Sequence, residues 1–329
     1  MGKDSPENMG RRRIVSSESW GRVARMSRRQ RVVLLGLAVV LLPLIVWVVA
    51  SPPVLLWSAT TRERPSAVAG DAVPRITEHP AVRIAVAGDT GTGDSAQRAT
   101  ARRMAAESRD VPYDALVLLG DLVYEDGEAR LTDSRVTKPF APVLDSGAQL
   151  LPVLGNHDYR SGEQQQILAT LGRQDPWYSQ RIGPVRVLVL DSNRVDDPEQ
   201  NRWLRRTLAE PQPAGTWTLA AMHHPAYSAG YHGSDLQVRD AWGPLFAQAG
   251  VRLALAGHDH DYQRSSPQQG VTYVVSGAAA RLRDAGSRDF TVVSDATLHY
   301  LDLLVYDDRV VGRAIDQSGT LVDLFTLTR

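Results

Sequence analysis

Short apolar runs alternate with amphipathic and polar stretches along most of this chain. Buried strands are predicted at residues 82–87, 115–119, 150–154, 185–190, 217–221 and 251–256. Helices are predicted between several of them, at residues 95–108, 198–209 and 237–248. The C-terminal part adds predicted strands at residues 271–276, 289–294, 298–306 and 309–315. Buried strands mixed with helices predict an α/β fold in which two sheets pack face to face with helices outside them.

A longer apolar run, residues 32–50, has a different character. It contains no charged residue, and it follows eight arginines within the first 31 residues. A helix of this length spans about 28 Å, which is close to the thickness of the hydrocarbon core of a bilayer. The positive-inside rule then leaves the N-terminus in the cytoplasm and exports the rest. We therefore predict a single-pass anchor in the cell membrane; cleavage after Ala50 and secretion are the alternative.

This run divides the chain into four predicted parts. A basic cytoplasmic arm (1–31) precedes the transmembrane helix (32–50), and a proline-rich linker (51–80) leads to a folded domain (81–329). The chain has no cysteine, which excludes disulfides and thiolate metal sites. Its 37 acidic and 37 basic side chains balance, so no nucleic-acid partner is expected.

Five short motifs follow predicted strands, and each contains a side chain that can bind a metal. They are Gly88-Asp89-Thr90-Gly91, Gly120-Asp121-Leu122-Val123-Tyr124, Gly155-Asn156-His157-Asp158, Ala220-Ala221-Met222-His223 and Gly257-His258-Asp259-His260. Six of the eight histidines lie in or near these motifs. A single Gly-Asp after a strand is usually a turn, so each motif alone is a weak indication. Together they gather metal-binding side chains at strand ends, where the loops of α/β folds converge.

The order of these motifs resembles that of the calcineurin-like metallophosphoesterase superfamily, and within it the purple acid phosphatases. The family pattern is GDxG, GDxxY, GNH[DE], VxxH and GHxH, and the chain departs from it only at Ala220, a packing position that usually holds Val. The resemblance covers about residues 82–265 and implies a four-layer α/β/β/α sandwich of two mixed sheets flanked by helices. The β-rich tail is expected to belong to the family's second sheet.

One position distinguishes the branches of the superfamily. Most relatives have Asp-x-His in the first motif, with the histidine as a metal ligand, whereas this chain has Gly91 there. Tyr124 in the second motif offers a replacement ligand. This exchange favours the branch in which a tyrosinate binds iron.

The resemblance implies two metal ions, each with three ligands of its own and one carboxylate between them. The expected ligands are Asp89, Tyr124 and His260 for the first ion, Asn156, His223 and His258 for the second, and Asp121 for the bridge. Carboxylate, phenolate and imidazole suit Fe(III), while an amide oxygen with two imidazoles suits Fe(II), Zn(II) or Mn(II). Such a pair activates a water molecule for attack on phosphorus.

The histidines outside the expected ligand set have different expected roles. His157 is expected to bind the substrate, together with Asn156, or to protonate the leaving group. His232 is a second candidate for these roles, with a solvated loop histidine as the alternative. Three other histidines, His79, His224 and His299, are expected to pack or to form ordinary hydrogen bonds. Asp158 is expected either to orient His157 or to cap a turn.

Three functions compete on these observations. The leading hypothesis is a phosphomonoesterase of the acid phosphatase type that acts on a small phosphoester outside the cytoplasm. The alternative is a phosphodiesterase for nucleotides or phospholipid headgroups, because substrate loops rather than the metal centre decide between them. The third is a membrane-tethered scaffold without catalysis, which predicts broken ligand sets, whereas all seven ligand positions are filled here. Oligomeric state does not follow from the sequence.

Overall fold

The computed structural model describes residues 69–329 of the chain. The expected basic arm, the transmembrane helix and most of the linker lie outside the described residues. Within the described part, no helix is both long and apolar enough to cross a membrane.

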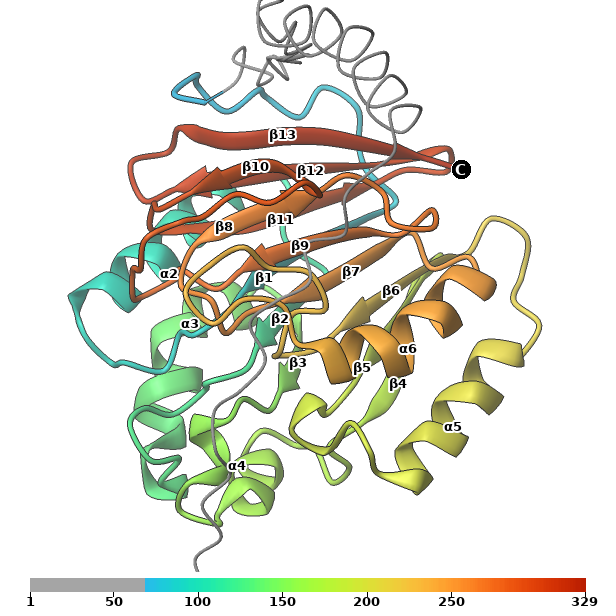
Figure 1. Ribbon diagram of the computed structural model, residues 1–329. Helices are drawn as coiled ribbons and strands as arrows, with labels where there is room; N and C mark the ends of the chain where they lie inside the picture. Colours follow the sequence, from blue (N-terminus) through green and yellow to red (C-terminus); the bar gives the residue numbers. More distant parts are fainter. Residues whose placement is uncertain (1–68) are drawn as a thin grey trace, which may run out of the picture. The chain divides into compact units, whose positions relative to one another are not determined.

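Two mixed sheets form the centre of the domain (Figure 1). The first has the order β13-β12-β11-β1-β2-β3. Its strands are β1 (Val82–Ala87), β2 (Ala115–Leu119), β3 (Gln149–Val153), β11 (His299–Val305), β12 (Arg309–Asp316) and β13 (Leu321–Thr328). The second has the order β10-β8-β9-β7-β6-β5-β4. Its strands are β4 (Tyr178–Ile182), β5 (Val185–Val189), β6 (Trp217–Ala221), β7 (Leu253–Ala256), β8 (Tyr262–Ser265), β9 (Thr272–Ser276) and β10 (Thr291–Asp295).

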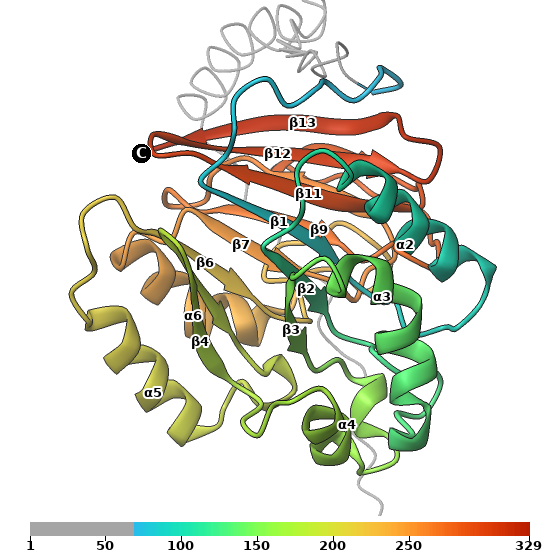
Figure 2. The ribbon, with the colours of Figure 1, turned by 180° about the vertical axis from the view of Figure 1, so that it is seen from behind.

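Helices cover the outer faces of both sheets (Figures 1 and 2). The α-helices are α2 (Ser95–Glu107), α3 (Lys138–Leu144), α4 (Gln164–Thr170), α5 (Pro198–Ala209) and α6 (Leu236–Gln248). Short helical turns are η1 (Ala129–Leu131), η2 (Asp133–Thr137), η3 (His157–Tyr159) and η4 (Ser192–Arg194). Side chains of α2, α3 and α4 pack on the first sheet, and those of α5 and α6 pack on the second.

Three apolar layers hold these elements together. The central layer lies between the sheets, where Ile84 and Leu303 of the first sheet pack with Val187 and Leu255 of the second. One outer layer lies between each sheet and its helices. The strands of the inner layer are buried on both faces, which explains why they are continuous apolar runs in the sequence. The expected four-layer sandwich is confirmed.

The C-terminal strands divide between the sheets. β9 and β10 join the second sheet, as expected for the β-rich tail. β11, however, pairs antiparallel with β1, so that β11, β12 and β13 extend the first sheet. The assignment of the whole tail to the second sheet was therefore wrong, because an apolar run does not reveal which of two packed sheets it completes.

The described end of the expected linker is attached to the first sheet. The Gly70 N–H donates to the Leu321 carbonyl oxygen at 2.8 Å. Arg313 donates to the Pro74 carbonyl oxygen at 2.7 Å. Residues 70–74 are thus bound to the domain rather than free of it.

His299 has the packing role expected from the sequence, and its burial should make the stability of the protein depend on pH. Its Nδ1–H donates to the Thr297 carbonyl oxygen at 2.8 Å, and its Nε2 accepts from the Ser276 hydroxyl at 3.0 Å. Burial lowers the pKa of His299 from 6.5 to about 4. At a pH between these two pKa values, the imidazole is protonated in the unfolded chain but neutral in the folded protein. The free energy of unfolding should therefore fall by about 3 kcal/mol as the pH falls from 6.5 to 4.

Replacement His299→Gln should remove this contribution. Urea unfolding of the wild type and the variant at pH 6.5 and at pH 4 would measure this contribution. Between these two pH values the variant should lose about 3 kcal/mol less stability than the wild type. An equal loss in both proteins would show that other groups cause the acid sensitivity.

Candidate metal centre

The carboxyl ends of parallel strands bring the five motifs to one edge of the sandwich. In the first sheet, β1, β2 and β3 run parallel and carry the first three motifs. In the second sheet, β6 and β7 run parallel and carry the last two. Because the sheets pack face to face, the five loops meet between them. The Gly88 N–H, for example, donates to Ser276 of the second sheet at 2.8 Å.

The three ligands expected for the first ion lie together. The Tyr124 hydroxyl donates to Asp89 Oδ1 at 3.1 Å and lies 3.2 Å from His260 Nε2. His260 Nε2 lies 3.3 Å from Asp89 Oδ1. These ligand atoms therefore face one another across a space that one cation would fill.

The three ligands expected for the second ion form a neighbouring group. His223 Nε2 lies 3.0 Å from Asn156 Oδ1 and 3.2 Å from His258 Nδ1. His224 adjoins this group, with its ring 4.6 Å from that of His258 and its Nδ1 accepting from the Ser192 hydroxyl at 2.9 Å. His224 belongs to a set of three histidines, with His223 and His258, whose ligand atoms lie within 4.8 Å of one another.

Asp121 adjoins both groups. Its Oδ1 lies 3.5 Å from His223 Nε2 in the second group. Its carboxylate also lies within 4.8 Å of ligand atoms of Asp89 and His260 in the first group. This is the position that a carboxylate bridging two ions must occupy. The structure thus brings together all seven side chains that the sequence singled out.

The backbone at this site is strained. Among the described residues, four other than glycine have positive φ, and three of these are candidate ligands: Asp89 (58°), Asp121 (51°) and His258 (71°). Such conformations cost about 1–3 kcal/mol each and persist where the surrounding fold imposes them. The strain is concentrated on the residues that would hold the ions, as at functional sites in general.

Two glycines in the motifs allow loops to approach closely. A Cβ at Gly155 would lie 2.2 Å from Asp121 Oδ1. A Cβ at Gly91 would lie 2.2 Å from the Leu122 carbonyl oxygen. The Gly91 N–H donates to the Asp121 carbonyl oxygen, and its own carbonyl accepts from the Tyr124 N–H, both at 3.0 Å. The first and second motifs are therefore joined backbone to backbone, with no room for a side chain at position 91.

The electrostatics of the site match a bound cation. Asp89 and Asp121 are almost completely buried. Burial raises the pKa of Asp89 to about 7. It also lowers the pKa of His223 and of His258, so both imidazoles are neutral and keep a lone pair for a metal. Two buried carboxylates without a cation are costly, and metal ions would supply the missing positive charge.

Surrounding hydrogen bonds orient the ligands. The His223 Nδ1–H donates to the Leu119 carbonyl oxygen at 2.8 Å, which leaves Nε2 free to face the site. The His258 N–H donates to Asp89 Oδ2 at 2.8 Å and so couples the two sheets. Such partners fix the direction of a ligand before any ion binds.

Of the two roles expected for Asp158, the structure shows the capping of a turn rather than the orientation of His157. Its carboxylate accepts from the N–H groups of Leu122, Val123 and Gly155, at 3.1, 2.9 and 2.8 Å. Asp158 therefore fixes the loops of the second and third motifs as a turn-capping residue. The ring nitrogens of His157 have other partners, the Glu125 carbonyl oxygen and the Arg160 guanidinium.

His157 and His232 lie on different sides of the centre. The His157 ring packs against the edge of the Tyr124 ring at 4.5 Å, and its Nε2 lies 3.9 Å from Asp121 Oδ2. The His232 ring lies 4.2 Å from the His258 ring. Each is therefore next to one of the two ligand groups, where a substrate-binding residue is needed.

A sequence model of calcineurin-like phosphoesterases matches residues 82–262, more than half of the chain. The chain belongs to the calcineurin-like phosphoesterase family. In an alignment of 239 positions, this phosphoesterase is 30% identical to tartrate-resistant acid phosphatase type 5 of Homo sapiens; the alignment covers 60% of the chain and 73% of that relative. In an alignment of 232 positions, it is 25% identical to purple acid phosphatase 17 of Arabidopsis thaliana; the alignment covers 61% of the chain and 69% of that relative.

A solved structure has the same fold. The purple acid phosphatase from yellow lupin seeds superposes with a TM-score of 0.67 and 19% identity, covering 76% of this chain. The match spans 55% of the lupin chain, so that protein extends well beyond the shared domain. The activity follows from the family model and the curated relatives: with the ligand groups above, they make the protein a metal-dependent phosphoesterase with a dinuclear centre and acid-phosphatase-like relatives.

Sequence reasoning missed a cation beside Tyr124. The Arg281 guanidinium lies 3.9 Å from the centre of the Tyr124 ring and pairs with the Glu125 carboxylate. Arg281 belongs to the loop between β9 and β10, which carries no motif. In the sequence, the only indication that Arg281 lies near the site is that it follows the fifth motif by about twenty residues.

Proposed function

We propose that this phosphoesterase is a phosphomonoesterase of the acid phosphatase type, with Fe(III) in the first ligand group and Fe(II), Zn(II) or Mn(II) in the second. The position of Asp121 between the two groups carries the proposal, since it allows one carboxylate to bridge two ions. The names of the similar proteins, tartrate-resistant and purple acid phosphatases, favour monoesters. Tyr124 in the first group favours iron, because phenolate is a ligand that suits Fe(III).

The bound ions and the side chains around them would have different roles in hydrolysis. When bound, two ions would lower the pKa of a water molecule and neutralise charge on the phosphoryl oxygens. His157, beside Asp121, would contact the phosphoryl group and, in its imidazolium form, give a proton to the leaving oxygen. The Arg160 guanidinium lies 3.0 Å from His157 Nε2, and His157 Nδ1–H donates to the Glu125 carbonyl oxygen at 2.6 Å. These contacts hold the imidazole beside Asp121, with its Nε2 3.9 Å from Asp121 Oδ2.

The proposal predicts a metal-dependent monoesterase. The purified full chain, loaded with iron and zinc or manganese, should hydrolyse 4-nitrophenyl phosphate faster than bis(4-nitrophenyl) phosphate. Removal of the ions with a chelator should abolish both reactions, and their return should restore them, because the ions supply most of the catalysis. Faster hydrolysis of the diester would instead make the protein a phosphodiesterase.

We also propose that the catalytic domain lies outside the cytoplasm, tethered by residues 32–50. The uncharged run of these residues after an arginine-rich arm supports this location. In the same assay, intact cells that express the chain should hydrolyse an aryl phosphate that cannot cross the membrane. Activity that appears only after lysis would contradict the location, and activity in the medium would indicate cleavage after Ala50.

A further inference from the structure

Two loops near the metal centre carry exposed apolar side chains. The loop between β6 and α6 (residues 222–235) carries Tyr231, and the loop between β9 and β10 (residues 277–290) carries Leu282. Tyr231 is 70% exposed and Leu282 is 48% exposed; with Leu236, at 59%, they are the large apolar side chains most open to solvent in the described part. Apolar side chains that gather in solvent beside a site are typical of a binding surface.

Tyr231 is held next to candidate metal ligands from two directions. Its ring lies 5.0 Å from that of His232, which in turn lies 4.2 Å from the His258 ring. The Arg283 guanidinium lies 4.2 Å from the centre of the Tyr231 ring. The main-chain N–H of Arg283 donates to the His260 carbonyl oxygen at 2.9 Å. Tyr231 and Arg283 thus form a stacked pair, and each is linked to one histidine of the fifth motif.

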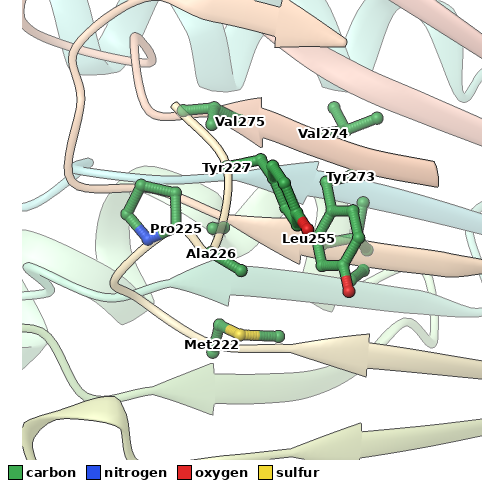
Figure 3. A pocket seen from close by; sticks show the side chains of 10 residues that line it. Met222, Pro225, Ala226, Tyr227, Leu255, Tyr273, Val274 and Val275 are labelled. Atoms are coloured by element: carbon green, nitrogen blue, oxygen red, sulfur yellow. The ribbon is translucent and has the colours of Figure 1, made fainter. Parts of the chain in front are cut away.

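The loop that carries Tyr231 is fixed at its base. Tyr227 packs on Tyr273 with ring centres 4.6 Å apart, against the apolar surface of the second sheet (Figure 3). The buried Asp259 carboxylate accepts from the Ser228 hydroxyl and, at 2.7 Å, from the His232 N–H. These contacts position the stacked pair before a substrate arrives, which reduces the entropy lost on binding.

We propose that Tyr231 and Arg283 form the leaving-group subsite of this enzyme, and that it takes phosphomonoesters whose alcohol carries a planar aromatic ring. The inference rests on the proposed phosphomonoesterase function. With the phosphoryl group between the two ligand groups, the ester oxygen and its alcohol must extend toward solvent. On the side of His232 and His258, the apolar surface that the alcohol meets is the Tyr231 ring.

The chemistry of the pair fits an aromatic ring. Tyrosine offers a π-face on which another ring stacks, and guanidinium stacks on aromatic rings as well. During hydrolysis the bond from phosphorus to the leaving oxygen breaks, a water oxygen bonds to phosphorus, and the leaving oxygen takes up a proton. None of these steps alters the stack, so the subsite acts through recognition of the alcohol.

Three monoesters test the subsite in the metal-loaded full chain: phenyl phosphate, adenosine 5′-monophosphate and glycerol 3-phosphate. Tyr231→Ala should lower kcat/KM about tenfold for the two aromatic esters, mainly through KM, as expected for the loss of one stacking contact. The value for glycerol 3-phosphate should stay unchanged. Tyr231→Phe, which keeps the ring, should behave like the wild type, and Leu236→Ala is the control for removal of an exposed apolar side chain.

Binding without turnover gives a second measurement. Calorimetry should show about tenfold weaker binding of phenylphosphonate to Tyr231→Ala, and equal binding of methylphosphonate to both proteins. An equal loss for aromatic and aliphatic ligands would overturn the inference, because Tyr231 would then only position His232. Failure of the proposed function has another signature: the wild type would hydrolyse none of the three monoesters.

Discussion

Asp121→Ala is expected to lower kcat for 4-nitrophenyl phosphate about a thousandfold or more. The carboxylate lies within reach of both ligand sets, 3.5 Å from His223 Nε2 and within 4.8 Å of Asp89 and His260 ligand atoms. Its loss would remove a ligand from each ion at once. Stabilisation of the transition state by metal ions contributes several kcal/mol, and each 1.4 kcal/mol corresponds to a tenfold change in rate.

Metal analysis and kinetics on the same preparation separate the possible outcomes. The variant should bind fewer than two ions per chain. Asp126→Ala removes an exposed acid from the same loop, with a side chain 69% exposed, and should keep both ions and activity. Full activity in Asp121→Ala would refute the bridging assignment. Unfolding of the metal-free proteins should be similar, which would show that the fold is intact.

Tyr124→Phe is expected to abolish the visible absorption band of the iron-loaded protein. That band arises from charge transfer between a tyrosinate and Fe(III), and Tyr124 is the candidate ligand of this kind. Its hydroxyl lies 3.1 Å from Asp89 Oδ1 and 3.2 Å from His260 Nε2. Burial raises the pKa of Tyr124 far above its ordinary value, so the phenolate should form only when a cation binds it. The Arg281 guanidinium over the ring would further stabilise that negative charge.

Absorption spectra of the wild type and two variants would test this assignment. Tyr159→Phe is the matched control, because Tyr159 lies in the neighbouring turn η3 and donates to Asp191 rather than to a candidate ligand. It should keep the band. An enzyme that is colourless and active with zinc or manganese alone would count against iron at Tyr124.

Most of the fold could be predicted because its central strands are buried on both faces. Continuous apolar runs located β1, β2, β5 and β6 within a residue of their observed bounds. The elements that escaped prediction depend on tertiary contacts. In β8, Arg264 pairs with the buried Asp323 of β13, at 2.6 Å, so a polar sequence became a buried strand. Helix α3 contains Pro142, a residue that locally argues against a helix.

The candidate ligands could be located in the fold for a different reason. Each stands directly after an apolar strand, so its place in the fold follows from local sequence. The positions of the residues that surround the candidate ligands do not follow from local sequence. Arg281 and Arg283 come from a loop without motif or periodicity, and only folding brings it over Tyr124 and Tyr231. The partners of Asp158 are main-chain groups, which a sequence pattern cannot identify.

The close contact at Gly91 has a consequence for how such enzymes diverge. A histidine at this position, as in most of the superfamily, would need a Cβ only 2.2 Å from the Leu122 carbonyl oxygen. The obstructing backbone belongs to the same loop that presents Tyr124. Exchange of one ligand for the other therefore requires a shift of that loop together with two substitutions. Intermediates along such a path would lack a ligand or strain the loop, so selection should rarely carry a lineage from one type of centre to the other.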